Sequence, residues 1–191
     1  TQPSGLTKDV EFLRRVYLDL TGVPPSPETV RAFRADARDT RIKRDEVIDR
    51  LVGSADYVEH WTNKWSDLLQ VNRKFLGEKG AWALRNWIRQ TITHNMPYDA
   101  FVYTLVTAKG STYDNPPSAY YKVLRQPEEL TENTTQLFLG IRFSCNKCHD
   151  HPFDDWEQKD FYELAAFFGK TRQVRSRQRN QVYTTEGHEM M

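Results

Sequence analysis

The amino-acid sequence predicts a mainly α-helical fold, an irregular multi-helix bundle with a short β-hairpin near its C-terminus. Three observations lead to this prediction. Apolar side chains recur at three- and four-residue spacing in successive segments, as they do along the buried face of a helix. Serine, proline and glycine stand where these segments begin and end. Only the last part of the chain changes character, with alternate arginines over residues 175–179 and a β-prone run over residues 182–185.

Four helices are expected in the first part of the chain, over residues 7–20, from residue 26 through Val30 and Phe33, and over residues 41–52 and 54–71. Thr7 is the expected N-cap of the first, and Gly22 lies just beyond its end. Ser26 is the expected N-cap of the second, with Pro27 at the first helical position. The third has Ile42, Val47, Ile48 and Leu51 at helical spacing. The apolar stripe of the fourth consists of Tyr57, Trp61, Trp65, Leu68 and Leu69.

Four more helices are expected over residues 81–93, 97–106, 130–139 and 158–168. Gly140 is expected to end the third of these in the left-handed conformation. Residues 110–118, rich in Gly, Ser, Asn and Pro, are expected to form a loop. We therefore predict one helical domain over residues 7–170. An extension over residues 171–191, with two short strands, is expected to lead into a further domain.

Composition restricts the class of protein. Apolar residues make up 38% of the chain and charged residues 28%, which is typical of a folded domain rather than a disordered segment. The net charge of +1 is far below that of a typical nucleic-acid-binding domain, so no nucleic-acid partner is expected. No apolar run approaches the roughly 18 residues of a transmembrane helix, so no membrane span is expected.

The most informative motif is Cys-Asn-Lys-Cys-His at residues 145–149, because this spacing is the attachment site of a c-type haem. Cys145 and Cys148 are the only two cysteines of the chain, and their thiols can add to the two vinyl groups of one porphyrin. His149 follows directly and is then the proximal ligand of the iron. The motif thus predicts one covalent haem c at the centre of the helical bundle. Because such attachment occurs outside the cytoplasm, it also predicts export.

A porphyrin needs apolar and aromatic walls. The residues expected to line this haem pocket are Phe143, Pro152 and Phe153 beside the motif, and Trp61 and Trp65 on the helix over residues 54–71.

The sixth ligand of the iron decides the chemistry of such a haem. His60 and Lys64 lie one turn apart on the helix over residues 54–71 and are the first distal candidates. Met96 is a weaker candidate, and an open distal position is an equal alternative. His151 is too close to His149 in the chain to reach the opposite face of the same ring. We expect it to form a hydrogen bond with the backbone or with a haem propionate.

Two other uses of the cysteines stay open. Cys145, Cys148 and one of His149 or His151 could bind zinc, although a closed structural site needs four ligands. The two thiols could also form a structural or redox-active disulfide.

Several stretches together resemble the planctomycete cytochrome-like domain of unknown function, a module of large secreted proteins. They are residues 12–28 (FLRRVYLDLTGVPPSPE), 61–69, 96–102 (MPYDAFV), 138–140 (FLG), 145–153 (CNKCHDHPF) and 160–168 (DFYELAAFF). The resemblance implies haem binding, export and fusion to other secreted domains, but no biochemical role. Many members have His-Trp-Leu-Asp where this chain has Lys64-Trp65-Ser66-Asp67, so a haem role of that histidine is in question here.

These observations predict an exported c-type cytochrome domain, periplasmic or extracellular. We expect it to transfer electrons to a redox partner protein or to neighbouring domains of the same polypeptide. The first alternative is a haem enzyme, or a sensor of a diatomic gas or peroxide, with an open distal site. The second is a zinc-binding structural or interaction module.

Overall fold

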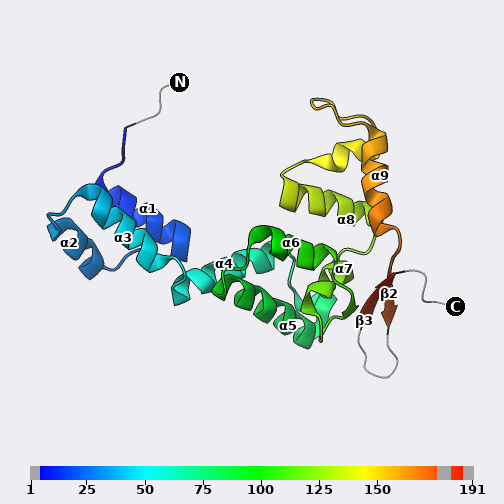
Figure 1. Ribbon diagram of the computed structural model, residues 1–191, viewed down its shortest axis with the longest axis horizontal. Coiled ribbons are helices and arrows are strands. Elements are labelled where there is room, and N and C mark those ends of the chain that lie inside the picture. The colour runs from blue at the N-terminus through cyan, green and yellow to red at the C-terminus, as the bar shows by residue number, and fades with distance from the viewer. Residues whose placement is uncertain (1–4, 176–181, 187–191) are drawn as a thin grey trace. The chain divides into compact units, whose positions relative to one another are not determined.

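The computed structural model describes residues 5–175 and 182–186 (Figure 1). The fold is mainly helical, as predicted. The chain forms two compact units, one of residues up to Trp65 with Arg89–Asn95 and one of Ser66–Ile88 with the chain from Met96 onward. This grouping differs from the expected division at residues 170 and 171. Residues 176–181 and 187–191 of the expected extension lie outside the described residues.

The first unit contains α1 (Asp9–Thr21), α2 (Pro27–Ala35), α3 (Thr40–Leu51) and most of α4 (Ala55–Leu68). Local signals set several of their ends. The Ser26 hydroxyl accepts a hydrogen bond from the Thr29 backbone N–H at 3.2 Å and caps α2, as predicted. Gly22 follows α1 in the left-handed conformation, with φ of 72°. The predicted N-cap Thr7 is wrong, because Lys8 occupies that position without a side-chain cap.

The core of the first unit is formed where α1, α2 and α3 pack together. Its buried members are Leu13, Phe33, Val47 and Leu51. Ile42, expected on the apolar face of α3, is 53% exposed, whereas the neighbouring Lys43 is only 7% exposed. Lys43 can be buried because its Nζ lies 2.6 Å from Asp9 Oδ2 while its carbon chain covers apolar surface.

Leu69 is buried as predicted, but the rest of the most buried face of α4 is turned by one residue from the predicted stripe. That face consists of Val58, Thr62, Ser66 and the following Leu69. Tyr57, Trp61 and Trp65 are only partly buried, and Leu68 is exposed. Thr62 tolerates burial because its hydroxyl donates to the Val58 carbonyl at 2.6 Å, so that its own donor is paired.

The second unit contains most of α5 (Arg73–Thr93), α6 (Tyr98–Val106), α7 (Tyr120–Val123), α8 (Pro127–Thr134) and α9 (Gln158–Phe168). Helix α5 starts earlier than predicted and is interrupted at Gly77, with φ of 72° and ψ of 171°. Helix α7 was not predicted. The helix expected over residues 130–139 is α8 followed by a π-helical turn (Thr135–Leu139), and Gly140 ends it in the left-handed conformation, as predicted. Helix α9 has the predicted bounds.

A small antiparallel sheet belongs to the second unit. Its strands are β1 (Gly110–Ser111), β2 (Thr171–Arg175) and β3 (Val182–Glu186), in the order β1-β3-β2. Thr184 of the central strand β3 pairs with Gly110 of β1 on one side and with Gln173 of β2 on the other. The segment expected to be a loop over residues 110–118 therefore contributes a strand, followed by a 3-10 helix (Pro116–Ala119). This pairing joins the C-terminal strands to the second unit.

Within the described residues, none of the helices combines the length and the apolar character that crossing a membrane requires.

Candidate functional site

The Cys-Asn-Lys-Cys-His motif forms one tight turn in the second unit. A 3-10 helix (Phe143–Lys147) leads into Cys148. The backbone N–H groups of Cys148 and His149 both donate to the Cys145 carbonyl, at 3.2 and 3.3 Å. Both thiols are free, that of Cys145 partly buried and that of Cys148 exposed. The turn therefore places two unpaired thiols and one imidazole within a single loop of backbone.

The orientation of His149 leaves one ring nitrogen available. Its ring is exposed, and Nδ1 lies 2.6 Å from the Asp150 carbonyl oxygen. A carbonyl only accepts hydrogen bonds, so Nδ1 carries the proton and donates. The lone pair of a neutral imidazole then lies on Nε2, the nitrogen that can bind a metal.

Asn146, between the two cysteines, holds the loop that follows the motif. Its side chain is fully buried, and Nδ2 donates to the Trp156 carbonyl at 2.7 Å. The backbone N–H of His151 donates to the same carbonyl at 2.8 Å. These two bonds close the loop over residues 149–157 onto the motif. Sequence reasoning missed Asn146, because an asparagine between two cysteines carries no signal of burial.

The N-terminal end of α9 provides a second attachment for the motif. The Lys147 carbonyl accepts hydrogen bonds from Gln158 Nε2 at 3.2 Å and from the Tyr162 hydroxyl at 3.1 Å. Asp150 Oδ1 accepts from the Gln158 backbone N–H at 2.8 Å, one of the donors that a helix start leaves unpaired. Asp150 thus helps to cap the start of α9.

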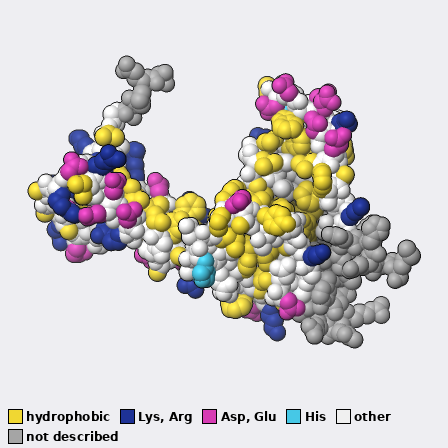
Figure 2. Space-filling view, viewed as in Figure 1, with side chains coloured by type: hydrophobic (Ala, Val, Ile, Leu, Met, Phe, Trp, Pro, Cys, Tyr) yellow, Lys and Arg dark blue, Asp and Glu magenta, His cyan; other side chains and the backbone are white. Residues whose placement is uncertain are grey.

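The residues expected to line a haem pocket beside the motif differ in their surroundings. Phe143 is 4% exposed, and its ring packs against those of Trp156 and Phe161 with centroids at 5.4 and 5.7 Å. Pro152 is exposed and Phe153 is 91% exposed. Phe143 is therefore part of the core beneath the motif. Figure 2 shows hydrophobic side chains gathered on the face of the second unit around α8 and α9, with acidic side chains at its tip.

The first two distal candidates, His60 and Lys64, and the aromatic wall expected on residues 54–71 belong to the first unit. Trp61 and Trp65 lie on α4, as do His60 and Lys64. The His60 ring meets the edge of the Trp61 ring at 5.8 Å, and Lys64 Nζ lies 5.0 Å from the Trp61 ring centre. His60 Nε2 and Trp61 Nε1 are buried and have no hydrogen-bond partner within the described chain. Met96 belongs to the second unit.

His151 is held by the backbone, as expected. Its Nδ1 accepts hydrogen bonds from the backbone N–H groups of Phe153 at 3.3 Å and Asp154 at 3.0 Å. The nitrogen that accepts these two bonds has no lone pair left for a metal. His151 thus stabilises the loop after the motif.

No three His, Cys, Asp or Glu side chains come together as a metal-binding group in the part of the chain that the structure describes. A structural zinc site takes four protein ligands, and the described residues do not bring such a set together. This finding does not bear on haem, whose porphyrin supplies four of the nitrogens around the iron.

A comparison with known families identifies the domain type. The family PSCyt2, described as "Protein of unknown function (DUF1549)", matches residues 1–173. This chain belongs to the PSCyt2 family. No curated protein and no solved structure matches it. Membership confirms the predicted resemblance to a domain family of unknown function. The cytochrome character and the planctomycete origin stay predictions.

The PSCyt2 match covers the motif, its loop and both sets of expected haem residues. At the motif, the side chains present are those that a c-type haem requires. They are two free thiols three positions apart and one imidazole whose Nε2 is available.

Proposed function

We propose that this PSCyt2 domain carries one c-type haem, bound covalently by Cys145 and Cys148 with His149 as the proximal iron ligand. The single observation that carries the proposal is the tight turn over residues 145–149, with two free thiols and the proton of His149 held on Nδ1. The haem then transfers electrons to a redox partner protein or to other domains of a larger exported protein, periplasmic or extracellular.

Attachment requires no further reactant. Each thiol adds across one vinyl group, so that sulfur bonds to one vinyl carbon and the hydrogen is transferred to the other. The haem, once bound, supplies one-electron chemistry at its iron. The Asp150 carbonyl keeps the proton on His149 Nδ1, while the hydrogen bonds of Asn146 and Lys147 hold the turn to the Trp156 carbonyl and to α9.

The test is expression in an exporting host that has a c-type haem maturation system. The protein should keep its haem in a denaturing gel and gain the mass of one haem. Cys148→Ser should leave at most one thioether bond and sharply reduce retention. His151→Ala is the matched control and should retain haem, because the side chain of His151 contacts only the loop after the motif, through the backbone N–H groups of Phe153 and Asp154 and the Asp154 carboxylate. A colourless protein, or one with stoichiometric zinc, would overturn the proposal.

The leading candidates for the sixth position of the iron are His60, Lys64 and Met96. His60 ranks ahead of Lys64, because a lysine must give up its proton to bind iron and would also lose its contact with the Trp61 ring. Each is tested by an alanine substitution in the haem-loaded protein, with the change from low to high spin as the readout. Loss of the low-spin spectrum in one variant alone identifies the ligand.

A haem enzyme or ligand sensor is a second candidate, and one observation favours it. In the described part of the second unit, the only other histidine is His151, and its Nδ1 is occupied by backbone donors. An open iron would bind carbon monoxide readily in the wild type. Ready binding, with spectra unchanged in the His60, Lys64 and Met96 variants, would favour sensing or catalysis over electron transfer.

A further inference from the structure

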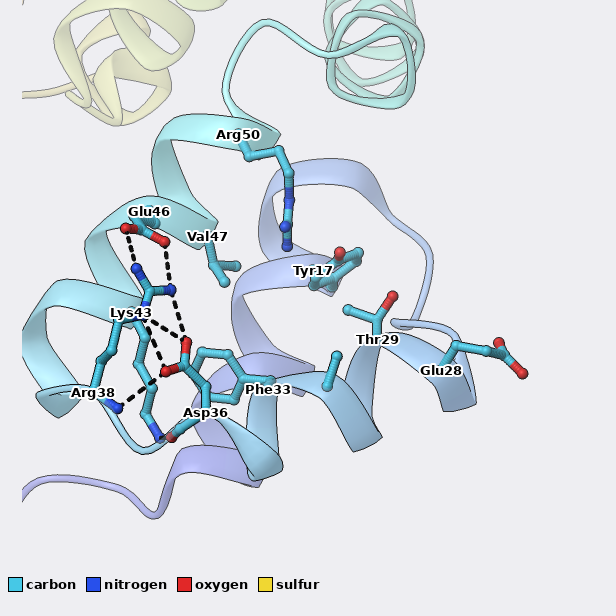
Figure 3. Close-up of a pocket in the computed structure, with 11 residues that line it drawn as sticks. Tyr17, Glu28, Thr29, Phe33, Asp36, Arg38, Lys43, Glu46, Val47 and Arg50 are labelled. Atoms are coloured by element: carbon cyan, nitrogen blue, oxygen red, sulfur yellow. Dashed lines mark hydrogen bonds and ion pairs between the residues drawn. The ribbon is translucent and has the colours of Figure 1, made fainter.

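The first unit contains a cavity of about 490 Å³ among α1, α2, α3 and the connection between α2 and α3 (Figure 3). This volume lies within the range of small-molecule sites, about 300–1,000 Å³. We propose that the cavity binds a small monocarboxylic acid with an apolar body, whose carboxylate pairs with Arg50. The proposal is independent of haem binding.

One wall of the cavity is a closed ion-pair network. Arg38 lies 2.6 Å and 2.8 Å from the two carboxylate oxygens of Glu46, through Nη1 and Nη2. It also contacts Asp36, with Nη2 at 2.7 Å from Oδ2 and Nε at 3.0 Å from Oδ1. Four of its five N–H donors are therefore used, and the two carboxylates leave this wall with one excess negative charge.

Lys43 is also committed to partners of its own. Its Nζ lies 2.6 Å from Asp9 Oδ2 and donates to the Asp36 carbonyl at 3.3 Å. The same nitrogen lies 4.9 Å from the centre of the Phe33 ring. Lys43 is thus no more available to a ligand than Arg38.

Arg50 differs from both. Figure 3 shows its side chain reaching from α3 into the cavity toward Tyr17 of α1. Among the residues that the structure describes, it forms no hydrogen bond or ion pair, and its charge only adds a weak electrostatic lowering of the Glu46 pKa. A guanidinium presents paired donors that match a carboxylate, and the Tyr17 hydroxyl can donate beside it.

The rest of the lining selects the remainder of the ligand. Ala32, Phe33 and Val47 give the cavity an apolar floor between the two charged ends. A ligand with its carboxylate at Arg50 would place an apolar body on this floor. A second negative charge would be repelled by the wall formed by Asp36 and Glu46. These features favour a monoanion with an aliphatic or aromatic body over phosphate.

Hexanoate is a suitable probe, with hexanamide as the neutral compound of the same shape. We expect hexanoate to shift the backbone amide resonances of Thr29, Val47 and Arg50 in the full chain, and hexanamide to bind at least about tenfold more weakly. Equal binding of the two compounds, tighter binding of inorganic phosphate, or the absence of shifts with hexanoate would overturn the proposal.

Variants on α3 locate the site. Arg50→Gln should weaken hexanoate binding about 10- to 100-fold, and Arg50→Lys should weaken it less, because the charge remains but the paired donors are lost. Arg41→Gln is the matched control, since Arg41 is an exposed arginine of the same helix that pairs only weakly with Asp45 at 3.9 Å. Unchanged affinity in a folded Arg50→Gln protein, or an equal loss in Arg41→Gln, would refute the assignment.

Discussion

Two features of the structure require glycine at position 22, its backbone conformation and its contact with His60. It ends α1 with φ of 72°, a conformation that residues with a Cβ adopt only at a cost. It also lies against the ring of His60, so a Cβ at this position would overlap Nδ1 and lie 2.9 Å from Cε1. The sequence marks this glycine as a helix end, and the structure adds the reason why His60 can pack so closely there.

Gly22→Ala should therefore destabilise the first unit more than backbone strain alone explains. Gly53 is the matched control, because it has φ of 77° and no atom within 4 Å of an added Cβ. We expect Gly53→Ala to cost about 1–2 kcal/mol from the left-handed conformation. Gly22→Ala should cost about 1–3 kcal/mol more, from overpacking against His60. Urea unfolding measures both, and equal losses would show that the His60 ring moves aside freely.

Asn146 provides a prediction at the motif itself. Asn146→Ala removes the hydrogen bond to the Trp156 carbonyl and should cost about 1–3 kcal/mol. Lys147→Ala is the control in the neighbouring position, because its exposed side chain only reaches Glu132 at 3.7 Å and its carbonyl is kept. Thermal unfolding gives the stability, and hydrogen exchange over residues 149–157 should rise only in Asn146→Ala. An equal response of the two variants would remove the structural role of Asn146.

At the scale of single elements, α9 connects the motif to the core. Phe161 is fully buried on α9 and packs against Phe143, which starts the motif turn. Phe167 lies on the same helix and is 81% exposed. Substitutions at these two positions therefore distinguish the effect of core packing from that of a surface change on the same helix.

Phe161→Ala should destabilise the second unit by about 3–5 kcal/mol, because it leaves a cavity in the core. Phe167→Ala should change stability by no more than about 0.5 kcal/mol. If the proposed haem attachment depends on a correctly packed turn, haem yield should also fall only in Phe161→Ala. Denaturant unfolding and haem staining test the pair, and similar results for both would show that Phe161 does not support the motif.

The elements differ in how well local sequence predicts them. Helix α9 and the start of α2 agree with prediction, since the Ser26 cap and the capping contacts of Glu157 with Asp160 act within three residues. The buried face of α4 was misassigned. The helical spacing of apolar residues predicted Trp61 and Trp65, whereas the structure buries the smaller Thr62, whose hydroxyl bonds to its own helix.

At the scale of the whole molecule, the two units should lose stability at opposite ends of the pH range. Burial raises the pKa of Tyr120 and of Tyr121 in the second unit to about 12. A raised pKa in the folded state gives stability that is complete below about pH 10 and lost as the pH rises toward 12. Urea unfolding at increasing pH should show this loss in the second unit, and Tyr120→Phe with Tyr121→Phe should flatten it. An unchanged alkaline profile in that double variant would contradict the assignment.

The first unit should respond to acid instead. Hydrogen bonds from Arg38 lower the pKa of Asp36 to about 2 and also lower that of Glu46, and a hydrogen bond from Lys43 lowers that of Asp9. These lowered values give stability that is present above about pH 4 and lost as the pH falls toward 2. Hydrogen exchange resolved by segment should show the first unit opening first in acid. Arg38→Gln should reduce the acid dependence, and an unaltered profile would exclude this network as its cause.

The sequence by itself determined the mainly helical class, most helix positions and the Cys145-to-His149 motif, because helix caps and cysteine spacing act over a few residues. Only the tertiary structure decided which side chains are buried and which distant segments meet. It buried Lys43 in place of Ile42, since Asp9 of another helix neutralises its charge. It placed the Asn146 side chain where it donates a hydrogen bond to the Trp156 carbonyl. It also paired β1 with β3, which are more than 70 residues apart in the chain. Such contacts depend on the packing of complete elements, which local patterns do not contain.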